Sequence, residues 1–163
     1  MSFDLSKKKA FVCDLDGTLF DTRADLAAAV NATRQALKLA PLPLEEAISH
    51  VGRGARHLLE HAIPEVADKF DETWPLFMEQ YQQHVLDTTM PYPGVRNTLA
   101  ELHDRGWLLG VCTNKPRFAT LALLDHFGFT RFMGNAIVAG GDCTEMKPSA
   151  MPLRECANRM RGH

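Results

Sequence analysis

Residues 11–22, FVCDLDGTLFDT, carry the clearest signal of the fold of this chain. An apolar run that begins at Ala10 ends at Cys13, and two carboxylates, Asp14 and Asp16, follow one residue apart. A short apolar run that ends in polar residues is typical of a buried parallel strand. We therefore expect a strand over residues 10–13 that presents both acids at its carboxyl end.

The two acids suggest a particular chemistry. Carboxylates this close repel each other unless a cation separates them or one of them holds a proton. Mg²⁺ prefers oxygen ligands and shares them with substrate phosphate, whereas a protonated Asp16 could act as a general acid. Gly17 permits a sharp turn that lets backbone amides face an anion. The alternative is an ordinary strand-end turn with two solvated acids.

Two further apolar runs predict strands over residues 107–113 and 136–139. Helices are predicted on either side of them, over residues 95–106, 118–127 and 149–160. Strands that alternate with helices indicate an α/β fold with a parallel sheet and right-handed crossovers.

Polar residues follow each predicted strand. Thr113 and Asn114 follow the second strand, and Lys147 lies beyond the third. In open parallel sheets, ligands bind beyond the carboxyl ends of the strands, so we expect these residues to lie beside Asp14 and Asp16. The alternatives are a helix cap for Thr113 and a surface charge for Lys147.

The middle of the chain predicts helices only. Apolar positions recur every three or four residues over 26–37 and again over 66–85, and Pro75 within the second stripe predicts a kink or two abutting helices. The sequence MPYPG at 90–94 is a proline-glycine hinge. We infer an all-helical cap, residues 21–90, inserted into a core formed by residues 1–20 and 91–163.

Composition narrows the class of protein. The chain has 163 residues, of which 45% are hydrophobic, and a formal net charge of −2. This charge offers no basic face for nucleic acid, and no apolar run reaches the roughly 18–20 residues of a membrane span. The four cysteines lack CxxC spacing, so we expect a reduced, cytoplasmic protein without structural disulfides or zinc.

FVCDLDGTLFDT resembles the first signature of the haloacid dehalogenase superfamily, in its aspartate-dependent phosphatase branch. Thr113-Asn114 resembles the second motif, and Lys147-Pro148 resembles the third. The order of the motifs, their approximate spacing and the helical insertion match over nearly the whole chain. The resemblance implies a Rossmann-like parallel core with an inserted helical cap.

The resemblance also implies roles for these residues. Asp14 would be the nucleophile that forms an aspartyl-phosphate, and Asp16 would protonate the leaving alcohol and then activate water. Thr113, with Asn114 beside it, would bind phosphoryl oxygens, and Lys147 would neutralise charge. Mg²⁺ would bridge the Asp14 carboxylate, the backbone carbonyl of Asp16 and the phosphate.

The insertion resembles the cap of the phosphoglycolate phosphatase-like group. This implies a Mg²⁺-dependent phosphatase for a small phosphate monoester similar to 2-phosphoglycolate. Arg53 and Arg56 are candidates for binding a substrate carboxylate, although solvated helix-start charges explain them more simply. Some mutase relatives use a cap histidine, so His50 and His57 leave a phosphomutase as a weaker alternative.

The family's fourth motif, which supplies a further Mg²⁺ ligand, has no counterpart in this sequence, so we expect the C-terminal part of the core to be missing. Asp142 and Glu145 look like ordinary loop residues of the family. Without the fourth strand, the first strand becomes an apolar edge that favours self-association. We therefore expect a truncated enzyme of doubtful activity, or alternatively a non-catalytic remnant that serves as an interaction protein.

Overall fold

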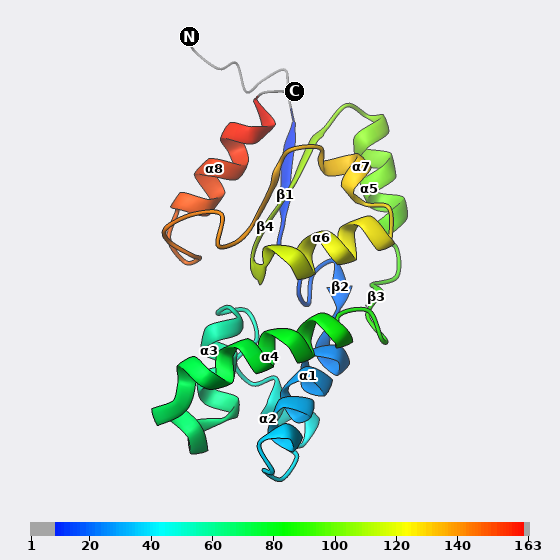
Figure 1. The fold of residues 1–163 in the computed structure, drawn as a ribbon. Coiled ribbons are helices and arrows are strands. Elements are labelled where there is room, and N and C mark those ends of the chain that lie inside the picture. The colour runs from blue at the N-terminus through cyan, green and yellow to red at the C-terminus, as the bar shows by residue number, and fades with distance from the viewer. Residues whose placement is uncertain (1–8, 162–163) are drawn as a thin grey trace.

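Three parallel strands form the sheet drawn in the upper part of Figure 1. They are β1 (Ala10–Cys13), β4 (Leu108–Pro116) and β5 (Ile137–Gly140), in the order β1-β4-β5. The computed structural model describes residues 9–161, so the ends of the predicted core at 1–8 and 162–163 lie outside the described residues. The parallel α/β fold predicted from the sequence is confirmed.

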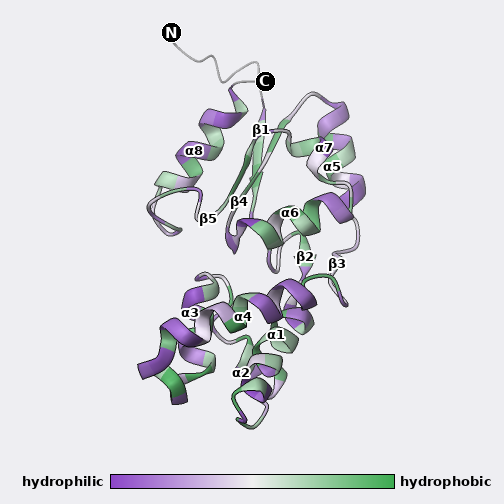
Figure 2. Ribbon diagram, viewed as in Figure 1, coloured by the Kyte–Doolittle hydropathy of each residue, from purple (hydrophilic) through white to green (hydrophobic). Residues whose placement is uncertain are grey.

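The two faces of the sheet bury different apolar clusters. Val111 belongs to the larger cluster, and its neighbour Cys112 belongs to a smaller one with Cys156 and Met160 of α8 (Met151–Met160). Successive side chains of a strand point to opposite faces, so a continuous apolar run supplies both clusters. Figure 2 shows this hydrophobic character along the strands.

Helices cover both sides of the strands in Figure 1, with α8 on one side and α5 and α7 on the other. The helices on that second side are α5 (Val95–Asp104) and α7 (Thr130–Met133). A third helix, α6 (Arg117–His126), lies near the carboxyl ends of the strands. The short α7 was not predicted, because four residues are too few to show a helical period.

The lower part of Figure 1 is helical. Its elements are α1 (Arg23–Ala36), α2 (Leu44–Ala47), α3 (Ala55–Ala62), the 3₁₀ helix η1 (Pro64–Lys69) and α4 (Phe70–His84). Pro75 lies inside α4, and the break in the predicted stripe instead falls at Val66, whose backbone leaves the helical region. As predicted, residues 24–86 contain no strand.

A short antiparallel ladder joins the two parts of the chain. It pairs β2 (Phe20–Asp21) with β3 (Met90–Pro91), so the two chain crossings lie side by side. Asp25, which is 2% exposed, reinforces this ladder by accepting hydrogen bonds from the backbone amides of Thr88 and Thr89, both 2.8 Å long. These crossings coincide with the ends we assigned to the cap, and the division into cap and core remains an interpretation.

The strand β1 lies at one edge of the sheet. Within the described residues it pairs only with β4, with Cys13 opposite Val111. Phe11 on this strand is 43% exposed. The described part of the structure therefore has the apolar edge strand that the sequence predicted.

Candidate active site

A cleft lies where the carboxyl ends of β1 and β4 meet the helical part of the chain. The sheet contributes Asp14 and Asp16, which follow β1, and the end of β4 from Thr113 to Pro116. The helical part contributes residues from α1, α3, α4 and the turn before α3; they are Leu26, Val51, Gly52, Gly54, Ala55, Leu58 and Tyr81. Because parallel strands end at one rim, residues about a hundred positions apart line the same cleft.

Asp14 has one carboxylate oxygen held by the protein and one that is not. Its Oδ1 accepts a hydrogen bond of 2.8 Å from the Leu15 amide and an ion pair of 2.9 Å from Lys147 Nζ. Within residues 9–161 its Oδ2 has no hydrogen-bond or ion-pair partner. The structure thus places Lys147 beside Asp14, as we expected from the shared rim of the strands. It leaves Oδ2 of Asp14 available to a ligand.

Asp16 shows the same arrangement with different donors. Its Oδ1 accepts from Thr22 Oγ1 and from Lys115 Nζ, both at 2.8 Å. The side chain of Asp16 is 11% exposed and that of Lys115 only 1%. A lysine therefore lies beside each acid, and the two ammonium groups offset the repulsion between the neighbouring carboxylates.

Lys115 is the residue of this site that the sequence argument missed. Burial on its own lowers the pKa of Lys115, but the neighbouring Tyr81 and Asp16 outweigh burial and raise it above its ordinary value. Burial also raises the pKa of Tyr81 to about 12. Because the phenol is therefore neutral near pH 7, the carboxylate of Asp16 is the partner that keeps the Lys115 ammonium charged.

Thr113 retains a hydroxyl hydrogen that it can donate. Its Oγ1 accepts a hydrogen bond of 3.2 Å from the Lys115 amide, and the residue is 4% exposed in the lining of the cleft. An acceptor hydroxyl still has its own proton to offer. This geometry suits the predicted contact with a phosphoryl oxygen.

Asn114 differs from the prediction. Its Nδ2 donates to the carbonyls of Gly52 and Lys147, each at 3.0 Å, and its Oδ1 accepts from the Lys147 amide at 2.9 Å. No donor of this amide is left for a phosphate. Asn114 instead positions the segment that carries Lys147 and connects it to the turn before α3.

Gly17 makes the predicted sharp turn but does not offer the predicted donor. Its φ of +74° is in the left-handed region, which glycine adopts without steric cost. Its amide donates to the carbonyl of Phe20 at 2.9 Å and is therefore not free for an anion. The turn directs the chain from Asp16 into β2, which is the structural role of this glycine.

The two cap arginines do not line the cleft. Arg53 is exposed, although it lies between the lining residues Gly52 and Gly54. The guanidinium of Arg56 lies 4.4 Å from the ring centroid of Phe70 and 3.7 Å from a carboxylate oxygen of Asp71. In this structure α3 turns Arg56 toward η1 and α4, and the contact of this arginine with a substrate stays a prediction.

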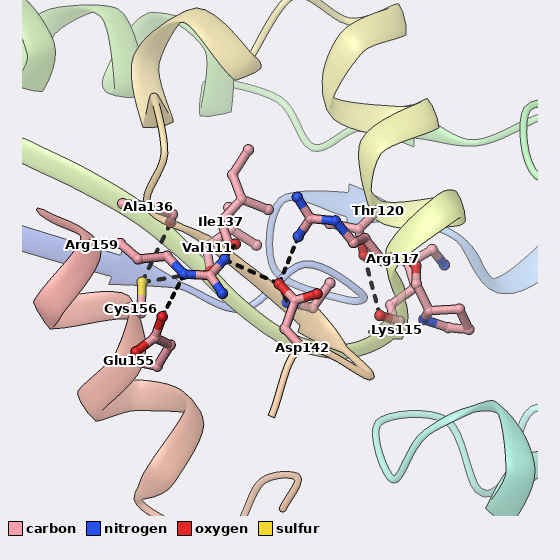
Figure 3. A network of polar contacts seen from close by, with 12 residues as sticks. Val111, Lys115, Arg117, Thr120, Ala136, Ile137, Asp142, Glu155, Cys156 and Arg159 are labelled. Atoms are coloured by element: carbon pink, nitrogen blue, oxygen red, sulfur yellow. Dashed lines mark hydrogen bonds and ion pairs between the residues drawn. The ribbon is translucent and has the colours of Figure 1, made fainter. Parts of the chain in front are cut away.

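Asp142 is held away from the two catalytic candidates. Figure 3 shows its carboxylate between Arg117 and Arg159, and Oδ2 lies 2.6 and 3.1 Å from their guanidinium nitrogens. Glu145 is exposed and lines a different hollow beside α8. Neither residue lines the cleft, in agreement with the expectation that they are ordinary loop residues.

Comparisons with known proteins show what this chain is similar to. A family model described as haloacid dehalogenase-like hydrolase matches residues 11–161. A phosphoglycolate phosphatase of Chromobacterium violaceum is 39% identical, with 94% of this chain and 71% of the relative covered. A phosphoglycolate phosphatase of Agrobacterium fabrum is 38% identical, with 85% and 61% covered. The chain thus spans about 61–71% of the length of these curated relatives.

Solved structures show the same fold. One described as a predicted phosphoglycolate phosphatase from Haemophilus somnus superposes with a TM-score of 0.85 at 26% identity, covering 94% of this chain and 72% of that one. One described as a putative haloacid dehalogenase-like hydrolase from Bacteroides fragilis superposes with a TM-score of 0.83 at 18% identity, covering 95% of this chain and 74% of that one. Within residues 9–161, no helix combines the length and apolar content that a membrane crossing requires.

Proposed function

Since the chain belongs to the haloacid dehalogenase-like hydrolase family, we propose that it hydrolyses a small phosphate monoester in the cleft at the ends of β1 and β4. One observation carries the proposal: Asp14 is anchored through Oδ1 by Lys147 and Leu15, while its Oδ2 is without a partner in residues 9–161. A fixed carboxylate with one free oxygen is a positioned nucleophile.

The first chemical step forms an aspartyl-phosphate. Oδ2 of Asp14 attacks phosphorus, the bond from phosphorus to the ester oxygen breaks, and the leaving alcohol takes a proton from Asp16. Thr113 and Lys147 hold the phosphoryl oxygens during transfer.

The second step restores the enzyme. Asp16, now ionised, removes a proton from water, and the resulting hydroxide attacks phosphorus of the aspartyl-phosphate. Orthophosphate leaves, Asp14 regains its carboxylate, and Asp16 again holds the proton that the next turnover needs. A single acid therefore serves both half-reactions.

The charges in the cleft leave room for a divalent cation. Two lysines balance Asp14 and Asp16, so a phosphate dianion would bring uncompensated negative charge. The donors that face the cleft are oxygens, which fit Mg²⁺ rather than a softer metal. We propose that the carboxylate of Asp14 and the backbone carbonyl of Asp16 would hold Mg²⁺, which when bound would neutralise charge on the phosphate.

The cleft favours a small substrate and requires movement to admit it. The room in it for solvent is about 20 Å³, close to the space that one water molecule needs. We infer that the helical part moves away from the sheet to admit substrate and then closes to exclude water. Ala55, at the start of α3, lines the cleft. The residue that precedes it, Gly54, is the N-cap of this helix and has no side chain that could accept a hydrogen bond from the first amides.

Those free amides suggest the substrate class. The first amides of a helix have no partner within the helix and favour an anion. We propose that they bind the carboxylate of a phosphorylated small acid such as 2-phosphoglycolate, in place of the arginines. The names of the curated relatives support this substrate.

The test is release of orthophosphate from 2-phosphoglycolate by the purified chain, with and without Mg²⁺. Asp14→Asn should lower kcat by about 10³-fold or more, because the amide cannot replace the nucleophile. Asp104→Asn, an exposed acid on α5, is the matched control and should leave kcat unchanged.

Other outcomes favour the alternatives. No turnover of any small phosphate ester with Mg²⁺ present would support a non-catalytic protein. A phosphorylated product without orthophosphate would support a phosphomutase, although neither His50 nor His57 lines the cleft.

A further inference from the structure

Three histidines gather on the helical part of the chain, outside the cleft. His57 and His61 lie one turn apart on α3, and His50 lies in the turn between α2 and α3. The ring centroid of His61 lies 4.0 Å from that of His50 and 4.0 Å from that of His57. The centroids of His50 and His57 are 5.2 Å apart. In the described part of the chain, no other group of three ligating side chains lies this close.

The ring nitrogens of these histidines are available. One nitrogen from each ring lies within 4.8 Å of the other two. Nδ1 of His61 lies 2.8 Å from the carbonyl oxygen of His57, and because a carbonyl only accepts, this nitrogen donates and Nε2 keeps its lone pair. Nε2 of His57 is buried and has no hydrogen-bond partner.

We propose that His50, His57 and His61 form a binding site for a divalent transition metal of the zinc or nickel kind. Neutral imidazole is a preferred ligand for these metals, whereas Mg²⁺ prefers oxygen. A hydrogen bond from one ring nitrogen to a backbone carbonyl is the usual way in which a ligating histidine is oriented. The orphan Nε2 of His57 would gain the partner that a buried polar atom requires.

The spacing suits coordination after small side-chain rotations. Zinc–nitrogen bonds are about 2.0–2.1 Å long, so tetrahedral ligand nitrogens lie about 3.4 Å apart. The present separations of at most 4.8 Å close to that value when the rings turn toward a shared centre. His61 is exposed and the other two are half-buried, which leaves a solvent side for entry and for a water as the remaining ligand.

Neighbouring charges have a mixed effect on this site. Burial, followed by neighbouring charges that include His61 and Arg53, lowers the pKa of His50 and of His57, which favours the neutral form that a ligand needs. Arg53 repels a cation and Glu60 attracts one, but solvent screens both because both side chains are exposed.

A metal here would join two segments that border the cleft. His50 directly precedes Val51 and Gly52, which line the cleft, while α3 carries the other two ligands. The metal would therefore fix the turn before α3 against the helix. This site is separate from the acids of the cleft and does not depend on the proposed hydrolysis.

The test is calorimetric titration of the untagged, metal-free chain with NiCl₂. We expect one Ni²⁺ per chain, an affinity lower by more than about tenfold in His61→Gln, and a rise in the thermal midpoint with Ni²⁺ that His61→Gln loses. His61 is exposed, so its replacement leaves the fold intact. His103→Gln, an exposed histidine on α5, is the matched control and should bind like the parent.

Two further arms separate this site from other metal ligands. Asp14→Asn should bind Ni²⁺ as the parent does, because the acid pair takes no part. The Co²⁺ complex should show no thiolate charge-transfer band, which excludes the half-buried Cys143. Equal Ni²⁺ affinity in the parent and His61→Gln, no measurable binding, or loss of binding in Asp14→Asn would each overturn the proposal.

Discussion

The ammonium of Lys115 lies 2.8 Å from Oδ1 of Asp16 and 5.1 Å from the centroid of the Tyr81 ring. Lys115 is the last residue but one of β4 and Tyr81 belongs to α4, so one buried cation contacts both the acid of the rim and the helical part that covers it. A buried charge is stable only with a close partner. The acid that we propose as proton donor is thus positioned by a lysine that faces both sides of the cleft.

Lys115→Met should lower kcat for phosphate release by about 10- to 100-fold, because a displaced acid transfers its proton poorly. The variant keeps most of the length of the side chain and removes its charge, which leaves the nearly buried carboxylate of Asp16 without its cation, so we expect a loss of stability beside the loss of rate. Steady-state kinetics and a thermal melt measure both. Lys69→Met, at an exposed position of η1, is the control; equal kcat in the two variants would contradict the role of Lys115.

Gly140→Ala should displace the end of β4, which carries residues of the cleft. A Cβ at Gly140 would lie 2.5 Å from the carbonyl oxygen of Asn114 and 3.0 Å from that of Lys115. The end of β4 must then shift, which we expect to lower stability by about 1–3 kcal/mol and to lower kcat as well. Urea unfolding and kinetics of the folded variant measure the two effects.

Gly110→Ala is the matched control for that experiment. Its Cβ would meet Met160 Cε at 2.5 Å and Cys156 Sγ at 2.8 Å, on the face of the sheet covered by α8 and away from the cleft. It should lose similar stability and keep its kcat. If both variants lose kcat equally, the effect comes from general destabilisation and the local argument for Gly140 is wrong.

The residues at the rim of the sheet could be predicted from the sequence because their placement follows from the topology of parallel strands. Parallel strands end on the same side, so Asp14 and Lys147 could be placed together before any contact was known, and the structure brings them to 2.9 Å. Lys115 could not be found this way. A lysine before a proline looks like a surface charge, and only the burial of its side chain in the fold distinguishes it.

The contacts of polar residues in the helical part could not be predicted, because they depend on which elements pack together. Periodicity identifies the apolar face of α3, but it does not say which element lies opposite each polar residue. Arg56 therefore faces Phe70 instead of the cleft. The three histidines met only because the turn before α3 folds His50 back over the helix, which a distance along the chain does not indicate.

The free edge of β1 predicts self-association. Phe11 is 43% exposed on a strand that, in the described residues, has a neighbour on one side only, and such edges pair with other chains. Light scattering should show a mass that rises with concentration, and Phe11→Lys should shift the chain toward monomer. Leu153→Lys on α8, at a site 50% exposed, is the control. A monomeric parent at every concentration would remove this prediction.

The pair Arg34–Glu65 predicts how stability depends on pH. The side chain of Arg34 is 5% exposed and donates to the carbonyl of Ala62 at 2.7 Å and to Glu65 Oε1 at 2.7 Å, so it connects α1 to the end of α3 and to η1. The hydrogen bond from Arg34 lowers the pKa of Glu65 below its ordinary value. A lowered folded-state pKa means that Glu65 contributes stability above its unfolded pKa and loses it as pH falls through the folded one.

Glu65→Gln should therefore destabilise the chain by about 1 kcal/mol near pH 7, a modest value because the Glu65 side chain is 42% exposed. The difference from the parent should shrink as pH falls below the ordinary range of a glutamate, since the parent then also holds a neutral side chain. Urea unfolding across that range measures the difference, with Glu101→Gln, an exposed acid on α5, as the control. A difference that stays constant down to the lowest pH would show that the packing of the side chain, and not its charge, supports Arg34.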